Sequence, residues 1–394
     1  MRTNVRKLIV TLHLSSLLAL GIASCGGGQS SGSGGAGGSG SGGAGGNGPS
    51  AGEYLWGFSL GDPNLYISTI STSTGQLGTP IASGGIACNS GGTIPSIAVT
   101  PSNKFTFVID KCIVSIHVYA MSGPGVVLQE IPESPYFVAN DLNSIAVDPS
   151  GKFLYAIGTN PSAIYQASVN GSTGALTLNS GMMVNGDIRQ VVIDPQGKFL
   201  FVSDETDGKI LVYSIGADGT LSPVSGSPFN VPANDQPEYM LIDSGGRFLY
   251  APVIQGGIAA FAVNGSTGAL ADIAGSPFPT SNQAFTLAIA PSAKFLYSIG
   301  GGANNAIDAF TIGAETGVLT SIAGSPFTAP NPLNSLTVDA SGGFLYATAQ
   351  VDTQADSVFF GFSINPSDGS LASLATSPYP APTFPVDAIS LNIP

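Results

Sequence analysis

The fold of this chain is decided by the stretch Ser144-Ile-Ala-Val-Asp-Pro-Ser-Gly-Lys-Phe-Leu-Tyr-Ala156. Its β-branched and aromatic runs flank Asp148-Pro149-Ser150-Gly151, four residues that are typical of a turn, so the stretch predicts a β-hairpin. Similar stretches begin at Ser96, Gln190, Tyr239, Thr286 and Ser335. The aromatic residue after the turn recurs at spacings of 46 to 49 residues, at Phe105, Phe153, Phe199, Phe248, Phe295 and Phe344. A repeat of this period indicates an architecture built from one small unit.

A second phrase follows each copy of the first. It is clearest at Ile258-Ala-Ala-Phe-Ala-Val-Asn-Gly-Ser-Thr-Gly-Ala-Leu270, which leads into Gly275-Ser-Pro-Phe278, and it also predicts a hairpin. Further copies lie at residues 65–86, 114–137, 163–181, 209–229, 306–327 and 357–379, which makes seven. Two hairpins give four antiparallel strands per unit, which is typical of a propeller blade. We therefore predict an all-β fold, a seven-bladed β-propeller.

The two ends of the repeat region complement each other. Glu53-Tyr-Leu-Trp-Gly57 is similar to the second strand of a blade, with no first strand before it. Asp387-Ala-Ile-Ser-Leu-Asn392 is similar to an innermost strand, with no second strand after it. Pairing of these two segments would complete the seventh blade and remove the open sheet edge.

The first residues have the pattern of an export signal. An apolar run at residues 8–20 follows basic residues at Arg2, Arg6 and Lys7, and it is too short to span a bilayer. Ile22-Ala23-Ser24-Cys25 then resembles a bacterial lipobox, in which the cysteine becomes the lipidated first residue. The alternative is an ordinary cleavage site with an incidental cysteine. We expect a lipoprotein attached to the bilayer of the cell envelope through acylated Cys25. An Asp at the next position would resemble an inner-membrane retention signal. The residue there is Gly26, which favours the outer membrane.

Residues 26–52 contain 15 Gly and 6 Ser and no aromatic residue, so they predict a tether without a core. The expected domains are therefore a signal peptide at 1–24, a lipidated cysteine and tether at 25–52, and the propeller at 53–394. All 24 acidic residues but only 8 of the 11 basic ones follow the signal, so the mature chain carries 8 − 24 = −16 charges. This charge argues against nucleic acid as a partner. We expect a monomer.

The run "DPSGKFLYA", the turn "TGAL" and the exit "GSPF" resemble the lactonase-type seven-bladed propellers. That family includes bacterial 6-phosphogluconolactonases and borders the YVTN-repeat surface proteins. The resemblance extends over about residues 53–394. It implies a ligand site at the mouth of the central channel, with lactone hydrolysis as the family's activity.

The residue before each innermost strand is expected to line that mouth. The positions in question are Pro95, Asn143, Arg189, Glu238, Phe285, Asn334 and Asp387. The loops after the second strands add charged residues at the same end, namely Asp110, Lys111, Asp204, Glu205, Asp207, Asp352 and Asp356. From the ring we select the ligand-binding candidates Asn143, Arg189, Glu238, Asn334 and Asp387.

Lactone hydrolysis needs a base that activates water and a donor that stabilises the developing oxyanion. Arg189 is the candidate donor, able to hold a carboxylate or phosphate in a bidentate manner. Glu205 or Glu238 is the candidate base. The alternative is a structural ion pair between Arg189 and Glu238 of the next blade.

Family members with phosphogluconolactonase-like sequences carry Gly-Pro-Arg-His before one inner strand and Asn-Glu-Leu after the following strand. In blade order this chain has Gln236-Pro237-Glu238-Tyr239 and Val253-Ile254-Gln255 at those places. One blade earlier, Arg189-Gln190 and Asp204-Glu205 supply the Arg and the Glu but no His. The mature chain has a single histidine, His117, which alternates within a strand pattern and is expected to be a structural blade residue.

The remaining candidates concern a metal and a disulfide. Asp204-Glu-Thr-Asp-Gly208 offers calcium-like oxygen donors at Asp204 and Asp207, but it lacks the bidentate glutamate that ends an EF-hand loop. We therefore expect no cofactor, with calcium as the alternative. Cys88 and Cys112 flank the first predicted hairpin at one end of its blade, and export to an oxidising compartment favours a disulfide between them over two free thiols.

Two functions remain open on this sequence. One is a hydrolase that acts on a lactone or sugar-like ligand at the channel mouth. The other is a binding or scaffold propeller that holds an envelope protein or a glycan. The missing histidine favours binding, whereas the family resemblance favours hydrolysis.

Overall fold

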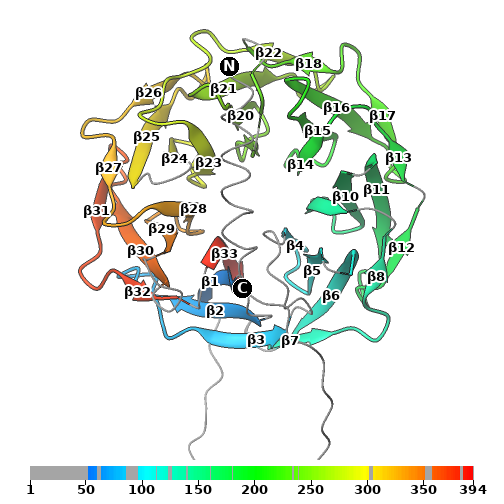
Figure 1. Ribbon diagram of the computed structural model, residues 1–394, viewed down its shortest axis with the longest axis horizontal. Coiled ribbons are helices and arrows are strands. Elements are labelled where there is room, and N and C mark those ends of the chain that lie inside the picture. Colours follow the sequence, from blue (N-terminus) through cyan, green and yellow to red (C-terminus); the bar gives the residue numbers. More distant parts are fainter. Residues whose placement is uncertain are drawn as a thin grey trace, which may run out of the picture. The chain divides into compact units, whose positions relative to one another are not determined.

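The computed structural model describes residues 52–59, 64–85, 96–111, 113–122, 127–138, 141–159, 161–179, 181–232, 235–237, 239–300, 305–350, 357–381 and 385–393. Within the compact unit Gly48–Pro394, seven small antiparallel sheets form a ring (Figure 1). The predicted all-β, seven-bladed propeller is therefore confirmed. Nowhere in the described ranges does a helix have the length and apolar character needed to cross a bilayer.

In six blades the strands follow one another from the axis outward in the order of the chain, and in the closing blade the last strand of the chain takes the innermost place. The innermost strands are β4 (Ile97–Val99), β9 (Leu142–Val147), β14 (Ile188–Ile193), β19 (Leu241–Ile242), β23 (Ala284–Ile289), β28 (Leu333–Val338) and β33 (Pro385–Ile393). The second strands are β5 (Phe105–Asp110), β10 (Phe153–Thr159), β15 (Phe199–Asp204), β20 (Phe248–Pro252), β24 (Phe295–Gly300), β29 (Phe344–Gln350) and β1 (Gly52–Ser59). We number the blades 1 to 7 in this order, so blade 7 contains both chain ends.

The outer half of each blade follows the same order. The third strands are β6 (Ser115–Ser122), β11 (Ser162–Val169), β16 (Lys209–Ile215), β21 (Ile258–Val263), β25 (Ala306–Ile312), β30 (Ser357–Ile364) and β2 (Asn64–Ile70). The fourth strands are β7 (Val127–Glu130), β12 (Leu176–Leu178), β17 (Leu221–Pro223), β22 (Leu270–Asp272), β26 (Leu319–Ser321), β31 (Leu371–Ser373) and β3 (Ile81–Gly85). Five blades add a two-residue strand that the sequence did not predict: β8 (Tyr136–Phe137), β13 (Met182–Met183), β18 (Phe229–Asn230), β27 (Phe327–Thr328) and β32 (Tyr379–Pro380).

The ring closes as the two ends of the sequence predicted. β1 pairs antiparallel with β33, with Tyr54 opposite Leu391 and Trp56 opposite Ile389. Figure 1 shows the red C-terminal strand beside the blue N-terminal one. Trp56 is fully buried, so this closing blade has an apolar core like its neighbours.

The repeated Phe-Leu-Tyr and Thr-Gly phrases contact each other across the blade junctions. The Phe199 ring packs against Gly268 in the next blade, whose φ of +74° is accessible to glycine and leaves no room for a Cβ. The tyrosine two residues after such a phenylalanine donates a hydrogen bond to the glycine carbonyl of the adjacent blade. Tyr155 does so to Gly219 and Tyr346 to Gly75, both at 2.7 Å. The two phrases therefore recur together, because the Phe-Leu-Tyr strand of each blade packs against and hydrogen-bonds to the Thr-Gly turn of the next blade.

Hydrogen bonds also connect the innermost strands to one another. The hydroxyl of Ser96 accepts the backbone N–H of Ile145 at 3.2 Å, and the hydroxyl of Ser144 accepts that of Val191 at 3.3 Å. In the following junction the side-chain oxygen of Gln190 accepts the N–H of Met240. These bonds set the spacing between the first blades and hold the residues that precede them at the mouth of the channel.

Candidate functional site

Four of the predicted mouth residues lie in β-bulges of the innermost strands. In blade 2 the pairing skips Asn143, because Gly158 lies opposite Leu142 and Ile157 lies opposite Ser144. The same irregularity occurs at Arg189 in β14, at Phe285 in β23 and at Asn334 in β28. A bulge leaves its extra residue unpaired and redirects its side chain. The bulges therefore explain why these positions differ from blade to blade while the strands after them keep one pattern.

Arg189 is held by two carboxylates of its own blade. Its Nε lies 2.5 Å from Glu205 Oε2, and its Nη2 lies 3.1 Å from Asp187 Oδ2. The arginine side chain is 45% exposed and that of Glu205 is 24% exposed, so the pair is accessible to a ligand. The alternative ion pair with Glu238 involves a residue outside the described ranges, and the described partners of Arg189 are Glu205, the candidate base, and Asp187.

Asp204 organises the loop that carries Glu205. Its Oδ1 accepts the backbone N–H groups of Asp187 at 3.1 Å and Asp207 at 3.3 Å. Burial raises the pKa of Asp204, and these two hydrogen bonds act in the opposite direction. The loop comes so close that a Cβ on Gly186, at φ +106°, would collide with the Asp204 carboxylate.

The calcium candidates therefore have other contacts in this structure. Asp204 accepts backbone donors, and the carboxylate of Asp207 lies 3.6 Å from Lys209 Nζ. In the part of the chain that is described, no three His, Cys, Asp or Glu side chains are grouped so that they could hold a metal ion.

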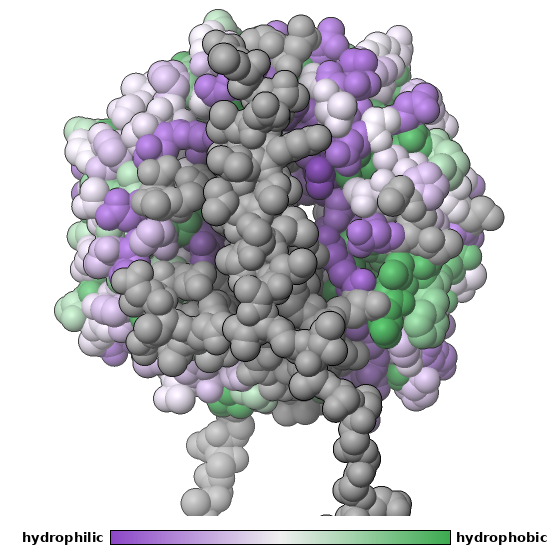
Figure 2. Space-filling model, viewed as in Figure 1, coloured by the Kyte–Doolittle hydropathy of each residue, from purple (hydrophilic) through white to green (hydrophobic). Residues whose placement is uncertain are grey.

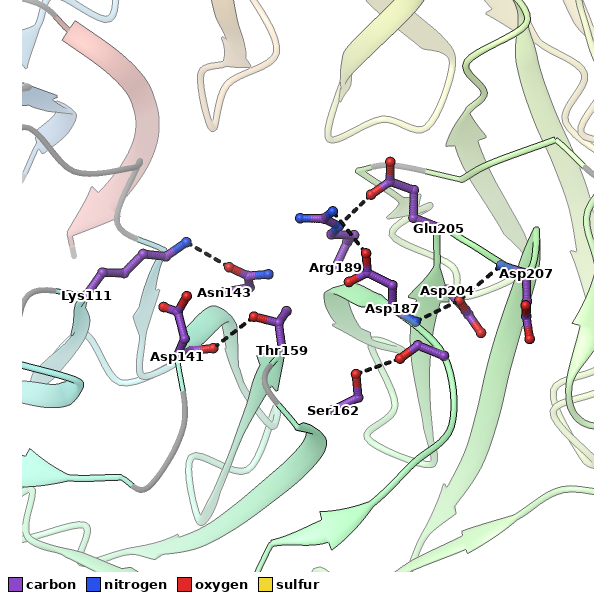
Figure 3. A network of polar contacts seen from close by, with 11 residues as sticks. Lys111, Asp141, Asn143, Thr159, Ser162, Asp187, Arg189, Asp204, Glu205 and Asp207 are labelled. Atoms are coloured by element: carbon purple, nitrogen blue, oxygen red, sulfur yellow. Dashed lines mark hydrogen bonds and ion pairs between the residues drawn. The ribbon is translucent and has the colours of Figure 1, made fainter. Parts of the chain in front are cut away.

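Lys111 reaches the same place from blade 1. Its Nζ donates a hydrogen bond of 2.7 Å to Asn143 Oδ1 in blade 2. Burial lowers the pKa of Lys111; the Asp141 carboxylate nearby raises it, and the Arg189 guanidinium lowers it further. Figure 3 shows Lys111 and Arg189 pointing toward one another, with Asn143 beside the space between them. We call Lys111, Asn143 and Arg189 the mouth cluster.

The mouth cluster brings together three consecutive blades. In Figure 2 hydrophilic residues, drawn in purple, gather along the inner edge of the ring on the side of blades 2 and 3. Blades 4 and 5 contribute aromatic groups instead. The rings of Tyr239 and Phe285 meet edge to face with 5.6 Å between centroids, and Tyr239 is 40% exposed. Polar side chains in blades 1 to 3 and aromatic rings in blades 4 and 5 are suited to a small polar ligand with apolar ring faces.

The remaining candidates are distributed as follows. Asn334 lies in blade 6, on the other side of the ring from β14 (Figure 1), and is not part of the mouth cluster. The backbone of Asp387 lies opposite Phe58 in the closing blade. Several predicted positions lie outside the described residues: the signal peptide, Cys25, the tether up to residue 51, Cys88, Pro95, Cys112, Glu238, Asp352 and Asp356.

His117 lies in β6 away from the mouth cluster. It is 3% exposed, its Nδ1 is 2.6 Å from Glu130 Oε1, and its Nε2 is 3.5 Å from Asp110 Oδ2. This placement agrees with the predicted structural role, because the ring bridges the second and fourth strands of blade 1.

Asp141 and Asp187 were not among the predicted site residues. Both carboxylates stand two residues before a bulged mouth residue, in Asp141-Leu142-Asn143 and Asp187-Ile188-Arg189. This repeated Asp-Leu/Ile-Asn/Arg pattern was a usable signal, because the same spacing in adjacent blades places both carboxylates at the same end.

These features define a seven-bladed β-propeller with a charged site at the entrance of its channel. Residues 50–233 match the family model described as Lactonase, 7-bladed beta-propeller, which confirms the resemblance predicted from the repeats over this part of the chain. The matched region contains the whole mouth cluster. A search of the curated proteins found no match.

Solved structures share the fold at low identity. A periplasmic gluconolactonase of Pseudomonas aeruginosa gives a TM-score of 0.71 at 18% identity, over 87% of this chain and 100% of that chain. A proposed 6-phosphogluconolactonase of Bacteroides fragilis gives a TM-score of 0.72 at 18% identity, over 87% of this chain and 99% of the other. A second Bacteroides protein, a proposed 6-phosphogluconolactonase of Bacteroides uniformis, gives 0.71 at 17% identity, over 86% and 99% of the two chains.

Proposed function

We propose that this protein is an exported, lipid-anchored propeller that binds a lactone at the mouth cluster and hydrolyses it. The observation that carries the proposal is the accessible pair of Arg189 and Glu205, with 2.5 Å between Nε and Oε2. A carboxylate and a guanidinium at one accessible point supply the base and the donor that lactone opening needs. The family match over residues 50–233, which includes both side chains, supports the same interpretation.

In this proposal Glu205 takes a proton from a water molecule whose oxygen bonds to the lactone carbonyl carbon. Arg189 stabilises the negative charge that develops on the carbonyl oxygen. The bond between the carbonyl carbon and the ring oxygen then breaks. The ring oxygen receives the proton from Glu205 and becomes a hydroxyl group, and the product is an open hydroxy acid.

The export part of the proposal rests on the first 25 residues. Several acyl chains on Cys25 would anchor the protein firmly, since each buried CH₂ contributes about 0.8 kcal/mol. The name of the Pseudomonas relative, a periplasmic gluconolactonase, supports an extracytoplasmic location. Phosphorylated sugars fit less well than neutral or carboxylated lactones, because the protein is acidic.

A non-catalytic binding propeller is the second candidate, and one observation favours it. Glu205 already contacts Arg189 closely, and Asp187 contacts the same guanidinium, as in an ion-pair network that orders a binding surface. An envelope protein or a glycan would then be the partner.

Hydrolysis of a panel of neutral and acidic lactones decides between them. We expect turnover by the purified protein to fall at least about 100-fold in Arg189→Ala and in Glu205→Ala. Loss of the base in Glu205→Ala typically costs a factor of about 10²–10⁴, and loss of the oxyanion donor in Arg189→Ala costs about 10²–10³. Glu315→Gln, an exposed change on an outer turn, is the matched control and should keep full activity. Absence of turnover on every lactone, with the circular dichroism spectrum of a folded protein, would contradict hydrolysis and leave the binding propeller.

A further inference from the structure

Lys111 and Arg189 point toward one another at the mouth, and none of the carboxylates drawn in Figure 3 lies between them. Lys111 comes from the loop after β5, and Arg189 comes from the bulge of β14, two blades further on. Like charges that converge in this way repel, and the Arg189 guanidinium does lower the pKa of Lys111. The arrangement therefore raises the free energy of the empty site.

Each nearby carboxylate that the structure describes interacts with only one of the two cations, and none of these bridges Lys111 and Arg189. Glu205 and Asp187 contact Nε and Nη2 of Arg189. Among the described residues Nη1 has no partner. Lys111 uses one of its three donors on Asn143 Oδ1, and Asp141 acts on it as a nearby negative charge. Both cations thus keep N–H donors for a ligand.

Asn143 adds a neutral donor at the same place. Its Oδ1 accepts the Lys111 ammonium, so its amide nitrogen is turned away from Lys111, and in Figure 3 it lies toward Arg189. An acceptor that enters between the cations would meet the ammonium, the amide and the guanidinium. Planar oxygens are the acceptors that a guanidinium fork recognises best.

We propose that a carboxylate bridges Lys111 and Arg189, and that the ligand is the open hydroxy acid formed by lactone hydrolysis. This inference rests on the proposed function, because it assigns the product of that reaction to the same site. The carbonyl oxygen that carries negative charge during ring opening becomes one oxygen of this carboxylate. The site therefore holds the product more tightly than the neutral lactone.

The charge balance favours a monoanion over a phosphate. Lys111 and Arg189 carry two positive charges, whereas Asp141, Asp187 and Glu205 carry three negative ones around them. A carboxylate brings one further negative charge, and a phosphate monoester brings nearly two. The additional charge of a phosphate would be repelled by the surrounding carboxylates, so the carboxylate is the better match.

The test is calorimetric titration of the full-length protein with D-gluconate and glycolate, and with D-glucitol as a neutral probe. We expect both anions to bind and D-glucitol to bind at least tenfold more weakly. Lys111→Met should weaken binding of the anions at least tenfold. Lys152 is an exposed lysine in the turn after β9, at the opposite end of that strand from the mouth, so Lys152→Met should leave anion binding unchanged. Gluconate binding should also weaken as pH rises through the lowered pKa of Lys111, and Lys111→Met should remove that pH dependence.

Each outcome is informative independently of hydrolysis. Gluconate binding that depends on Lys111 in a protein without lactone turnover would support this inference and contradict the proposed hydrolysis. Lactone turnover, together with an anion affinity that Lys111→Met leaves unchanged, would support the proposed hydrolysis and contradict this inference. Equal affinity for gluconate and glucitol, or no binding of either anion, would overturn the bridge between Lys111 and Arg189.

Discussion

Glu53 gives the protein a built-in dependence of stability on pH, and Glu53→Gln should remove it. This glutamate lies in β1 of the closing blade and is 6% exposed. It shares a hydrogen bond with the carboxyl of Asp339 from blade 6. Asp339 also accepts the N–H of Phe344 at 2.7 Å and a hydroxyl hydrogen bond from Ser341, so Glu53 is the partner that carries the proton.

Burial, followed by the hydrogen bond to Asp339 and the charge of that group, raises the pKa of Glu53 from 4.5 to about 7, while the backbone of Ser341 acts against them. The folded state therefore binds a proton that the unfolded chain releases above pH 4.5. The stability that this proton contributes is complete below the unfolded pKa, falls as pH rises through the folded one, and is largely lost above about pH 7. At about 1.4 kcal/mol for each unit of pKa, the full loss is about 3 kcal/mol.

The glutamine side chain in Glu53→Gln would resemble the protonated carboxyl in shape and could donate to Asp339 at any pH. We expect this variant to match the wild type at about pH 4 and to be more stable by up to about 3 kcal/mol at about pH 8.5. Urea unfolding at both pH values measures the difference. Glu315→Gln, which removes an exposed carboxylate, is the control and should show the same stability difference from the wild type at both pH values. A constant difference between Glu53→Gln and the wild type across pH would refute the shared proton at the ring closure.

Two further predictions concern a blade junction and the membrane anchor. Gly268→Ala should destabilise the protein by about 2–4 kcal/mol, because φ is +74° and the new Cβ would lie 2.6 Å from the Phe199 ring. Gly265→Ala in the same turn meets nothing within 4 Å and should cost less than about 0.5 kcal/mol in urea unfolding, so equal effects of the two changes would contradict the junction. Cys25→Ala should move the protein from the membrane pellet to the soluble fraction of fractionated cells, and retention in the pellet would show that lipidation of this residue is not the anchor.

The amino-acid sequence by itself determined the blade, the number of blades and their closure. Period-two apolar patterns and Asp-Pro-Ser-Gly turns are local features, so the hairpins could be predicted without knowledge of their surroundings. The repeat spacing then implied a ring, and the unmatched strands at the two ends implied that the ring closes through β1 and β33. The position before each innermost strand was predicted as the mouth for the same reason, since every blade repeats one path.

Only the tertiary structure decided which charged side chains meet at the mouth. Lys111, Asn143 and Arg189 come from three different blades, and the contact of Lys111 with Asn143 depends on the angle between those blades and on the bulge in β9. The choice of Glu205 as the partner of Arg189 depends on the loop that Asp204 organises. Such contacts join loops through space, and the direction of a bulged side chain follows from the packing around it. A local sequence pattern carries no information on that packing, which explains why the ring could be predicted and the pairing within the site could not.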